Sequence, residues 1–259
     1  MADWNSAQYL KFKSQRTQPA IDLAARIDIE NPLDMIDIGC GPGNSTRVLK
    51  KRFPNARVIG ADYSKNMLEA AKRDNPGCDF IRLDAGGDLS DLAEKFDVVF
   101  SNACIQWIPD HHKLLPNLFS MLKIDGVLAV QVPVNFEEPI HRIITKTAAS
   151  PKWSKVFSDP RIFFTLTEEE YFDILSGLTD DFELWKTVYF HRMPDVESII
   201  EWYRSTGLKP YLDELSENGG NDFINDVRTE LVREYPARKN GEIIFRFPRL
   251  FFMARRSKK

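Results

Sequence analysis

The chain has 259 residues, of which 43% are hydrophobic and 28% are charged, and its formal net charge at pH 7 is −3. This composition is typical of a globular enzyme whose core is large enough to be stable without disulfide or metal cross-links. A net charge so near zero lacks the basic footprint of a nucleic-acid-binding protein, so no nucleic-acid partner is expected.

Two further features of the composition bear on metals and compartment. The three cysteines are far apart and form no Cys-x-x-Cys pair, which predicts neither a disulfide framework nor a zinc site, and no metal is expected. The sequence contains no apolar run long enough to span a bilayer and no basic leader ahead of such a run, so no membrane partner is expected. We therefore predict a cytoplasmic protein.

At the N-terminus, residues 3–27 begin with Asp-Trp-Asn-Ser, a helix-entry pattern, and continue with apolar residues at helical spacing. Since this segment precedes the first predicted strand, it can fold over the ligand edge of a sheet. We expect residues 1–27 to form cap helices. On the pattern alone, Tyr9 and Arg16 could equally be a core aromatic residue and a solvated charge.

The chain is organised around residues 33–46, which read Leu-Asp-Met-Ile-Asp-Ile-Gly-Cys-Gly-Pro-Gly-Asn-Ser-Thr. The apolar residues predict a short strand, the three glycines predict a turn, and the polar residues after them lead into a helical pattern. In an open α/β sheet, this order places a ligand at the carboxyl end of the first strand. The glycines permit positive φ angles and let the ligand lie directly on the backbone.

The glycine spacing indicates which kind of ligand binds. Dinucleotide-binding turns read Gly-x-Gly-x-x-Gly and hold a pyrophosphate with free helix N–H groups, whereas here the glycines follow Gly-x-Gly-x-Gly and Pro42 removes one donor. Asp37 at the head of the turn adds a negative charge, which suits a cation better than a phosphate. S-adenosylmethionine fits, because it carries a sulfonium and an ammonium group and no phosphate. An ordinary glycine turn of another α/β protein is the alternative.

Acidic residues follow the next two predicted strands. Residues 57–62 form the second strand and end at Asp62, about 20 residues beyond the last glycine, where a carboxylate can accept hydrogen bonds from ribose hydroxyls. Residues 78–83 form the third strand and lead to Asp84. This acid is expected to face the ligand, and the alternative is that it caps the turn that follows.

Residues 96–102 form a fourth, largely apolar strand, and residues 126–133 form a fifth. With helices between them, the five strands repeat one β-α period, which predicts a doubly wound parallel sheet. The carboxyl ends of parallel strands share one crevice. Asn102 and Ala103 are therefore expected to contact the cofactor, and Gln106-Trp107 to contact the cofactor or the substrate.

The second half of the chain alternates helical stretches with two long β patterns. Residues 182–190 and 242–253 are predicted as strands six and seven. Residues 136–181 and 195–240 are predicted as mostly helical insertions that cover the crevice and shape the substrate pocket, with their aromatic side chains mainly in the core. The whole chain, residues 1–259, is thus predicted as a single domain, with its cofactor-binding core over residues 28–135.

These motifs resemble class I S-adenosylmethionine-dependent methyltransferases, and over almost its whole length the sequence is similar to the trans-aconitate 2-methyltransferase family. The stretches that carry the similarity are DWN at 3–5, IGCGPGNST at 38–46, QWIPDH at 106–111, GVLAVQ at 126–131, YFDILS at 171–176 and FPRLF at 247–251. The pair Gly86-Gly87 departs from the family pattern. The resemblance implies an α/β, Rossmann-like fold with a seven-stranded, mostly parallel sheet, in which the seventh strand lies antiparallel between the fifth and the sixth.

The motifs and the resemblance together predict S-adenosyl-L-methionine as the cofactor, released as S-adenosyl-L-homocysteine. Tyr9 and Arg16 resemble the aromatic and arginine residues that reach the cofactor carboxylate in this class, and Asp84 resembles the acid that faces the adenine amino group. The complete predicted cofactor set is Tyr9, Arg16, Asp37, Gly39, Gly41, Asn44, Asp62, Tyr63, Met67, Asp84, Ala85, Asn102, Ala103 and Trp107.

The resemblance also implies the reaction, which is methyl transfer to one carboxylate of a small-molecule tricarboxylate. A carboxyl group with a pKa of about 4 is ionised at neutral pH, so no general base is needed, and the chain is expected to act only by positioning and electrostatics. Because a multiply charged anion needs fixed donors, the predicted substrate residues are Gln106, Trp107, Tyr189, His191 and Arg249. Two alternatives remain, a methyltransferase for another small or carrier-bound acid and a non-catalytic S-adenosylmethionine-binding regulator.

Overall fold

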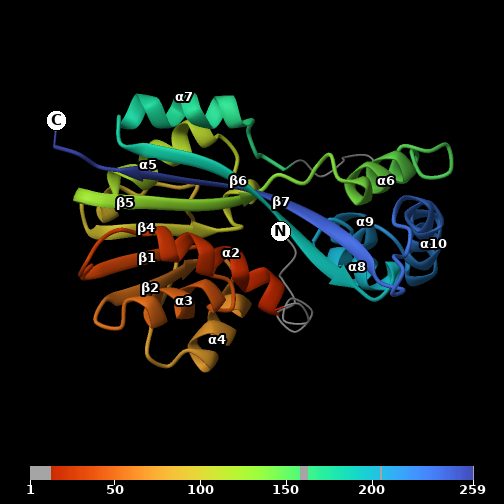
Figure 1. The fold of residues 1–259 in the computed structure, drawn as a ribbon, viewed down its shortest axis with the longest axis horizontal. Helices are drawn as coiled ribbons and strands as arrows, with labels where there is room; N and C mark the ends of the chain where they lie inside the picture. Colours follow the sequence, from red (N-terminus) through yellow and green to blue (C-terminus); the bar gives the residue numbers. More distant parts are fainter. Residues whose placement is uncertain (1–12, 158–162, 205, 259) are drawn as a thin grey trace. The chain divides into compact units, whose positions relative to one another are not determined.

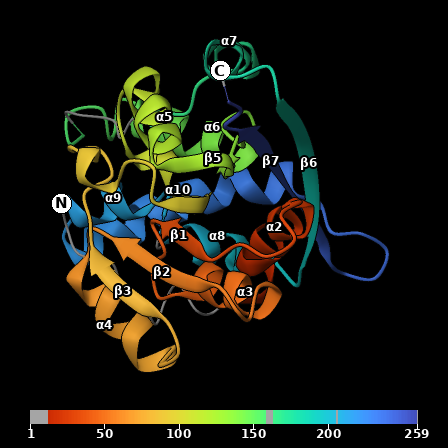
Figure 2. The ribbon, with the colours of Figure 1, turned by 90° about the vertical axis from the view of Figure 1, so that its left-hand side faces the viewer.

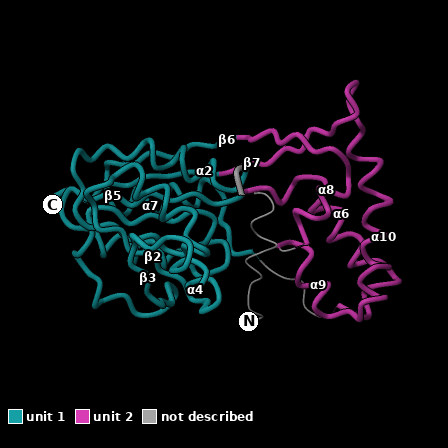
Figure 3. Tube along the Cα trace, turned by 90° about the horizontal axis from the view of Figure 1, so that it is seen from below, with its two compact units in different colours: residues 1–133, 163–187, 250–259 teal, residues 134–162, 188–249 magenta. Residues whose placement is uncertain are grey.

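The computed structural model describes residues 13–157, 163–204 and 206–258. The chain divides into two compact units, which Figure 3 shows in different colours. Unit 1 comprises residues 1–133, 163–187 and 250–259, and unit 2 comprises residues 134–162 and 188–249. Within the described part of the chain, none of the helices combines the length and the apolar character needed to cross a membrane.

A seven-stranded sheet has the order β3-β2-β1-β4-β5-β7-β6 (Figure 1). The strand order reverses between β1 and β4, so the connections that leave their carboxyl ends run in opposite directions, and open α/β sheets bind ligands in the crevice formed at such a point. The pairs β1–β2, β1–β4, β2–β3 and β4–β5 are all parallel. The strands are β1 (Asp34–Ile38), β2 (Arg57–Asp62), β3 (Asp79–Arg82), β4 (Phe96–Asn102), β5 (Leu122–Pro133), β6 (Phe182–Met193) and β7 (Ile243–Arg255).

Strand β7 runs antiparallel to its neighbour β5. The amide of Asp125 donates to the carbonyl of Arg256 at 2.7 Å, while the amide of Val134 donates to the carbonyl of Pro248 at 3.1 Å. The residue number therefore rises along β5 as it falls along β7, which is the antiparallel pattern. The predicted α/β fold, with a mostly parallel sheet and the seventh strand between the fifth and sixth, is confirmed.

Helices cover both faces of the sheet in unit 1. Figures 1 and 2 show α5 and α7 on one side of the sheet and α2, α3 and α4 on the other. Helix α2 packs through Ala20, Leu23 and Ala24, which are at most 1% exposed. The helices and short 3-10 turns of this unit are α2 (Lys13–Arg26), α3 (Asn44–Arg52), α4 (Lys65–Asp74), η1 (Ser90–Leu92), η2 (Ile105–Trp107), α5 (His111–Ser120) and α7 (Glu168–Leu178).

Helix α7 belongs to unit 1, although the sequence grouped its residues with the first helical insertion. Thr167 and Glu170 form a capping box that starts the helix, with their side chains satisfying each other's backbone amides. The helix then buries Tyr171 and Leu175 completely. Only residues 136–162 of that predicted insertion lie in unit 2.

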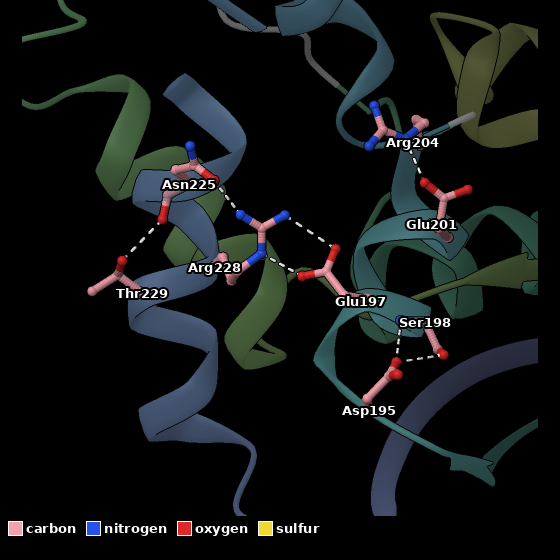
Figure 4. A network of polar contacts seen from close by, with 8 residues as sticks. All are labelled: Asp195, Glu197, Ser198, Glu201, Arg204, Asn225, Arg228 and Thr229. Atoms are coloured by element: carbon pink, nitrogen blue, oxygen red, sulfur yellow. Dashed lines mark hydrogen bonds and ion pairs between the residues drawn. The ribbon is translucent and has the colours of Figure 1, made fainter. Parts of the chain in front are cut away.

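Unit 2 is built from α6 (Pro139–Ala148), α8 (Val196–Arg204), α9 (Lys209–Asp213), α10 (Glu217–Glu234) and parts of β6 and β7. Its core is aromatic, as expected: the ring of Phe223 packs edge-on against Trp153 at 5.2 Å and against Phe157 at 5.1 Å between centroids. A polar network joins α8 to α10, in which the guanidinium of Arg228 donates to both carboxylate oxygens of Glu197 (Figure 4).

Candidate functional site

The glycine turn after β1 forms a floor that, as far as the described residues go, is unobstructed at Gly41. Gly39, Gly41 and Gly43 all have positive φ angles, of 71°, 52° and 81°. A Cβ on Gly39 would lie 2.1 Å from the Cys104 sulfur, and one on Gly43 would lie 2.4 Å from the Asn75 amide nitrogen, so both glycines are required for packing. At Gly41 no described atom lies within 4 Å of the Cβ position. This open floor is where a ligand can lie on the backbone, and a side chain would fill it.

Asp37 is a buried carboxylate that is only half satisfied. The hydroxyls of Ser45 and Thr46 both donate to its Oδ2, each at 2.7 Å. Its Oδ1 is buried, and no described residue bonds to it. Burial, helped by the negative charge of Asp62, raises the pKa of Asp37 to about 6, against the opposing effect of the two hydroxyl hydrogen bonds. A cationic group at Oδ1 would supply the missing partner and favour the ionised carboxylate.

Asp62 is held by two backbone donors at the carboxyl end of β2. Its Oδ2 accepts from the amide of Gly41, and its Oδ1 accepts from the amide of Ser64, both at 2.8 Å. The Ser64 hydroxyl in turn caps α4 by accepting from the amide of Met67. These two bonds fix the orientation of the carboxylate.

The aromatic residue after this acid is presented to solvent. Tyr63 is 50% exposed. The Arg82 guanidinium lies 5.1 Å from the centre of the Tyr63 ring, and Arg82 Nε donates to the Tyr63 carbonyl at 3.2 Å. Such a ring, backed by arginine, offers a face for stacking a heterocycle.

Asp84 caps a turn, which was the alternative for this residue. Its Oδ1 accepts from the amide of Gly86 at 3.0 Å, and its carbonyl accepts from the amide of Gly87 at 3.1 Å. The residue is exposed, whereas the neighbouring Ala85 is buried. A contact between Asp84 and a ligand stays a prediction.

At the end of β4 and in the segment after it, two buried side-chain amide oxygens accept no hydrogen bond from the described residues. The side-chain oxygens of Asn102 and Gln106 are buried and accept no hydrogen bond from any described residue. The side-chain amide nitrogen of Gln106 donates to the carbonyl of Ala103, at 2.8 Å. Ala103 itself has a φ angle of 54°, a strained value for a residue with a side chain. On α3, the amide nitrogen of Asn44 is also buried, and no described residue accepts from it. Unsatisfied polar atoms that gather at the ends of β1 and β4 favour a polar ligand there.

The predicted substrate residues of unit 2 form one aromatic and cationic cluster. Tyr189 and His191 face the same way on β6, as alternation along a strand predicts, with their rings only 8° from parallel. The His191 ring stacks on Trp202 with 5.0 Å between centroids. Arg249 on β7 is 4% exposed, and its guanidinium lies 4.5 Å from the centre of the Phe247 ring.

His191 in this cluster is neutral at pH 7. Burial, together with the positive charge of Arg249, lowers the pKa of His191 to about 4. Its Nε2 is buried, and no described residue is hydrogen-bonded to it. A buried guanidinium beside an unsatisfied neutral imidazole suits a carboxylate, which accepts from both.

Named proteins are similar in sequence to this chain over almost its whole length. The protein is 43% identical over 256 residues to trans-aconitate 2-methyltransferase of Enterobacter sp. strain 638, covering 99% of each chain. It is 40% identical over 257 residues to the enzyme of the same name from Shigella dysenteriae, covering 99% of this chain and all of that one. The chain belongs to the trans-aconitate 2-methyltransferase family. A family model described as a methyltransferase domain matches residues 35–126.

Solved structures place this member of the trans-aconitate 2-methyltransferase family in the methyltransferase fold. The YcgJ protein of Bacillus subtilis superposes with a TM-score of 0.61 at 15% identity, covering 93% of this chain and all of that one. Phosphoethanolamine N-methyltransferase 2 of Haemonchus contortus, solved with S-adenosyl-L-methionine, superposes with a TM-score of 0.58 at 19% identity, covering 93% of this chain and 53% of that one. The prediction of a methyltransferase with a Rossmann-like fold is confirmed.

The structure divides the predicted residues of this family member between the two units. Unit 1 holds those of the glycine turn, the ends of β2 and β4, and Gln106 and Trp107, whereas unit 2 holds Tyr189, His191 and Arg249. Arg16 is buried on α2, and Tyr9 lies outside the described residues. The binding roles of all these residues stay predictions.

Sequence reasoning missed several side chains that support the site. Ser45 and Thr46 were assigned only to the start of a helix, but both donate to Asp37. Phe163, whose ring lies 4.8 Å from that of Trp107, and Trp202, which stacks on His191, come from distant segments. The hydroxyl pair directly after the glycines was the available signal for the first two. Nothing local marks the aromatic contacts.

Proposed function

We propose that this protein transfers a methyl group from S-adenosylmethionine to one carboxylate of trans-aconitate, or of a closely related tricarboxylate, and forms a monomethyl ester. The observation that carries the proposal is the 43% identity, over essentially the full chain, to a trans-aconitate 2-methyltransferase. The groups described above suit the two ligands of that reaction. Unit 1 offers acids and an open glycine floor, and unit 2 offers a buried cation.

The residues of unit 1 fit S-adenosylmethionine. The buried Oδ1 of Asp37, to which no described residue is hydrogen-bonded, suits a positively charged group, and the carboxylate of Asp62, fixed by two backbone donors, suits ribose hydroxyls. Gly41 leaves room for the ligand on the backbone, and the exposed ring of Tyr63 suits the adenine face. When bound, S-adenosylmethionine supplies an electrophilic methyl group on a sulfonium.

The residues of unit 2 suit the acceptor. Arg249 can offer a fork of N–H donors to a carboxylate, and His191 and Tyr189 add neutral donors. The acceptor carboxylate, with a pKa of about 4, is ionised at neutral pH, so the chain need not supply a base. The chain has to hold one carboxylate oxygen of the acceptor within about 3 to 3.5 Å of the methyl carbon, in line with the carbon–sulfur bond that breaks.

Charge is lost when an anion and a cation react, and this gives the aromatic side chains a role. Water stabilises the separate charges more than the neutralised transition state, so a site that excludes water favours the reaction. Trp107 with Phe163 in unit 1, and Trp202 with Phe247 in unit 2, are apolar surfaces of the required kind next to the polar binding groups. The chain needs no covalent intermediate for this chemistry.

We place the reaction in the cytoplasm. Cys40, Cys78 and Cys104 are all free thiols. Free thiols persist in a reducing compartment, which supports this placement.

The test is to incubate purified protein with S-adenosylmethionine and a panel of di- and tricarboxylates that includes trans-aconitate. S-adenosylhomocysteine and the ester are then followed together by mass spectrometry. Turnover on trans-aconitate well above the other acids is expected. Preferred turnover on a different or carrier-bound acid would replace the proposed acceptor, and cofactor binding without any ester would leave a regulatory binder.

A further inference from the structure

His111 and Tyr171 form a buried polar pair outside the predicted binding residues. His111 is 1% exposed and Tyr171 is 0% exposed. The Nδ1 atom of His111 lies 2.8 Å from the Tyr171 hydroxyl, and its Nε2 lies 2.8 Å from the carbonyl oxygen of Ile105. His111 is the first residue of α5 and follows Asp110, whose side chain caps the helix.

The direction of these hydrogen bonds is determined by their chemistry. A carbonyl oxygen can only accept, so the proton of the neutral imidazole must be on Nε2, and Nδ1 must accept from the Tyr171 hydroxyl. The hydroxyl oxygen in turn lies 3.4 Å from the amide of Leu166, which can donate to it. Burial lowers the pKa of His111 and raises the pKa of Tyr171, so both groups stay neutral at pH 7. The Leu166 amide therefore donates to the Tyr171 hydroxyl, the hydroxyl donates to His111, and His111 donates to the Ile105 carbonyl.

This chain of hydrogen bonds ends on the turn that carries two predicted binding residues. The carbonyl of Ile105 opens the 3-10 turn η2, which contains Gln106 and Trp107. It accepts both from Ile108, at 2.9 Å, and from His111, so both of its lone pairs are used. The bond from His111 therefore constrains this carbonyl, together with the bond from Ile108 within the turn.

The segment before α7 holds the same turn from a second side. The amide of Phe164 donates to the carbonyl of Gln106 at 3.0 Å. The ring of Phe163 contacts the ring of Trp107, with 4.8 Å between centroids. Leu166 lies in this segment, and Tyr171 lies on α7, which follows it. The polar pair and the aromatic contact therefore both connect this part of unit 1 to the turn.

We propose that His111 is a positioning residue for methyl transfer: through the Ile105 carbonyl, and oriented by the Tyr171 hydroxyl, it holds the turn that presents Gln106 and Trp107 to the ligands. The proposal rests on the proposed function, because that function makes Gln106 and Trp107 binding residues. His111 does not itself touch the reacting atoms. Its removal changes the placement of the turn and not the chemistry of any reacting group.

Two amide substitutions separate the bond to Ile105 from the rest of the imidazole. His111→Gln can place an N–H near the former Nε2 and keep the donor to Ile105. His111→Asn can place its amide only near the former Nδ1, toward Tyr171. Both variants lose the ring and its stacking on Tyr171, and each can keep only one of the two hydrogen bonds of His111. His111→Gln keeps the bond to Ile105, and His111→Asn keeps the bond to Tyr171.

We expect His111→Gln to keep kcat/KM for the acceptor within about threefold, and His111→Asn to lower it by at least about tenfold, as the loss of one hydrogen bond to a buried carbonyl would produce. Hydrogen exchange of the peptide that covers residues 104–108 should be faster in the Asn variant only, with equal thermal unfolding temperatures in the two. Equal kcat/KM values in the two variants, whether reduced or unchanged, would overturn the proposal.

The exchange measurement needs no turnover, so it separates this proposal from the proposed function. If the unmodified protein forms no ester, the proposed function fails. Faster exchange in His111→Asn alone would then still show that the histidine holds the turn. If the ester forms but the exchange rates of the two variants match, the positioning role fails and the proposed function stands.

Discussion

The amide of Gly41 donates to Oδ2 of Asp62 at 2.8 Å, although the two residues lie 21 positions apart. The bond joins the open floor of the glycine turn to the acid at the end of β2. The bond can form because β1 and β2 are parallel and in register, with Ile38 opposite Ala61. The residues that follow the two strands therefore lie at the same edge of the sheet. The floor and the acid are therefore one rigid feature of unit 1.

Replacing this acid should weaken cofactor binding. Asp62→Asn keeps the size of the side chain but removes its charge, and charge-assisted hydrogen bonds contribute about 1.5 to 3 kcal/mol each. We expect S-adenosylmethionine to bind about 10- to 100-fold more weakly, as measured by titration calorimetry. Asp79→Asn is the matched control, because Asp79 begins the next strand and pairs with Arg57 in an exposed salt bridge. Undiminished binding in Asp62→Asn would remove Asp62 from the ribose site.

A methyl group on the glycine floor should affect binding more than folding. Gly41→Ala adds a Cβ where no described atom lies within 4 Å, so its folding cost is limited to the positive φ angle, roughly 1 to 2 kcal/mol. Gly241→Ala is the matched control, since Gly241 has a φ angle of 83° and is equally open among described atoms. Both variants should lose similar thermal stability, and only Gly41→Ala should lose at least about tenfold in affinity for S-adenosylmethionine. Equal affinities would show that the ligand does not lie on this floor.

Cofactor affinity should depend on pH through Asp37. Burial raises the pKa of Asp37 to about 6, so the carboxylate that a cation needs is progressively lost below that pH. We expect binding to be about tenfold weaker at pH 5 than at pH 7.5. In Asp37→Asn, affinity should be low and independent of pH over this range. Asp34→Asn, at the opposite end of β1, should keep the pH dependence of the unmodified protein.

The raised pKa of Asp37 affects the stability of the ligand-free protein in the opposite direction, because it favours the folded state at low pH. A carboxyl group whose pKa is raised in the folded state holds its proton more tightly there than in the unfolded chain. Its contribution to the free energy of unfolding is therefore present at low pH and lost as the pH rises from the usual 3.8 through about 6. Asp37→Asn should remove this decline from a denaturant titration series, and a decline that survives the substitution would contradict the assignment.

Arg249 should control acceptor affinity and leave cofactor affinity alone. Arg249→Lys keeps the charge but loses the fork of donors, and Arg249→Ala loses both. We expect the acceptor KM to rise in the order wild type, Lys, Ala, by about tenfold or more for Ala, since a charged hydrogen bond is lost. Arg246→Ala is the control on the same strand, because Arg246 is exposed. An unchanged KM in Arg249→Ala would exclude Arg249 from the acceptor site.

The sequence predicted those parts of the fold and site that rest on local pattern. The glycine turn, the acid of β2 and the alternation of Tyr189 and His191 each follow from spacing within one or two segments, and parallel strands bring such residues together automatically. The side-chain partners were harder to predict. The contact between His111 and Tyr171 spans 60 positions, and the grouping of α7 with unit 1 joins segments that are distant in sequence, so neither leaves a local signature.

The two units interleave in sequence, and this has a consequence for how new specificities arise. Every acceptor residue we propose apart from Gln106 and Trp107 is encoded within residues 188–249, while the glycine turn and its acids are encoded before residue 134. Exchange of residues 134–162 and 188–249 between homologous genes would swap one set of acceptor-facing groups for another and leave the methyl-donor motif intact. Substitutions confined to these segments therefore change the proposed acceptor groups of unit 2 and leave the glycine turn and its acids as they are.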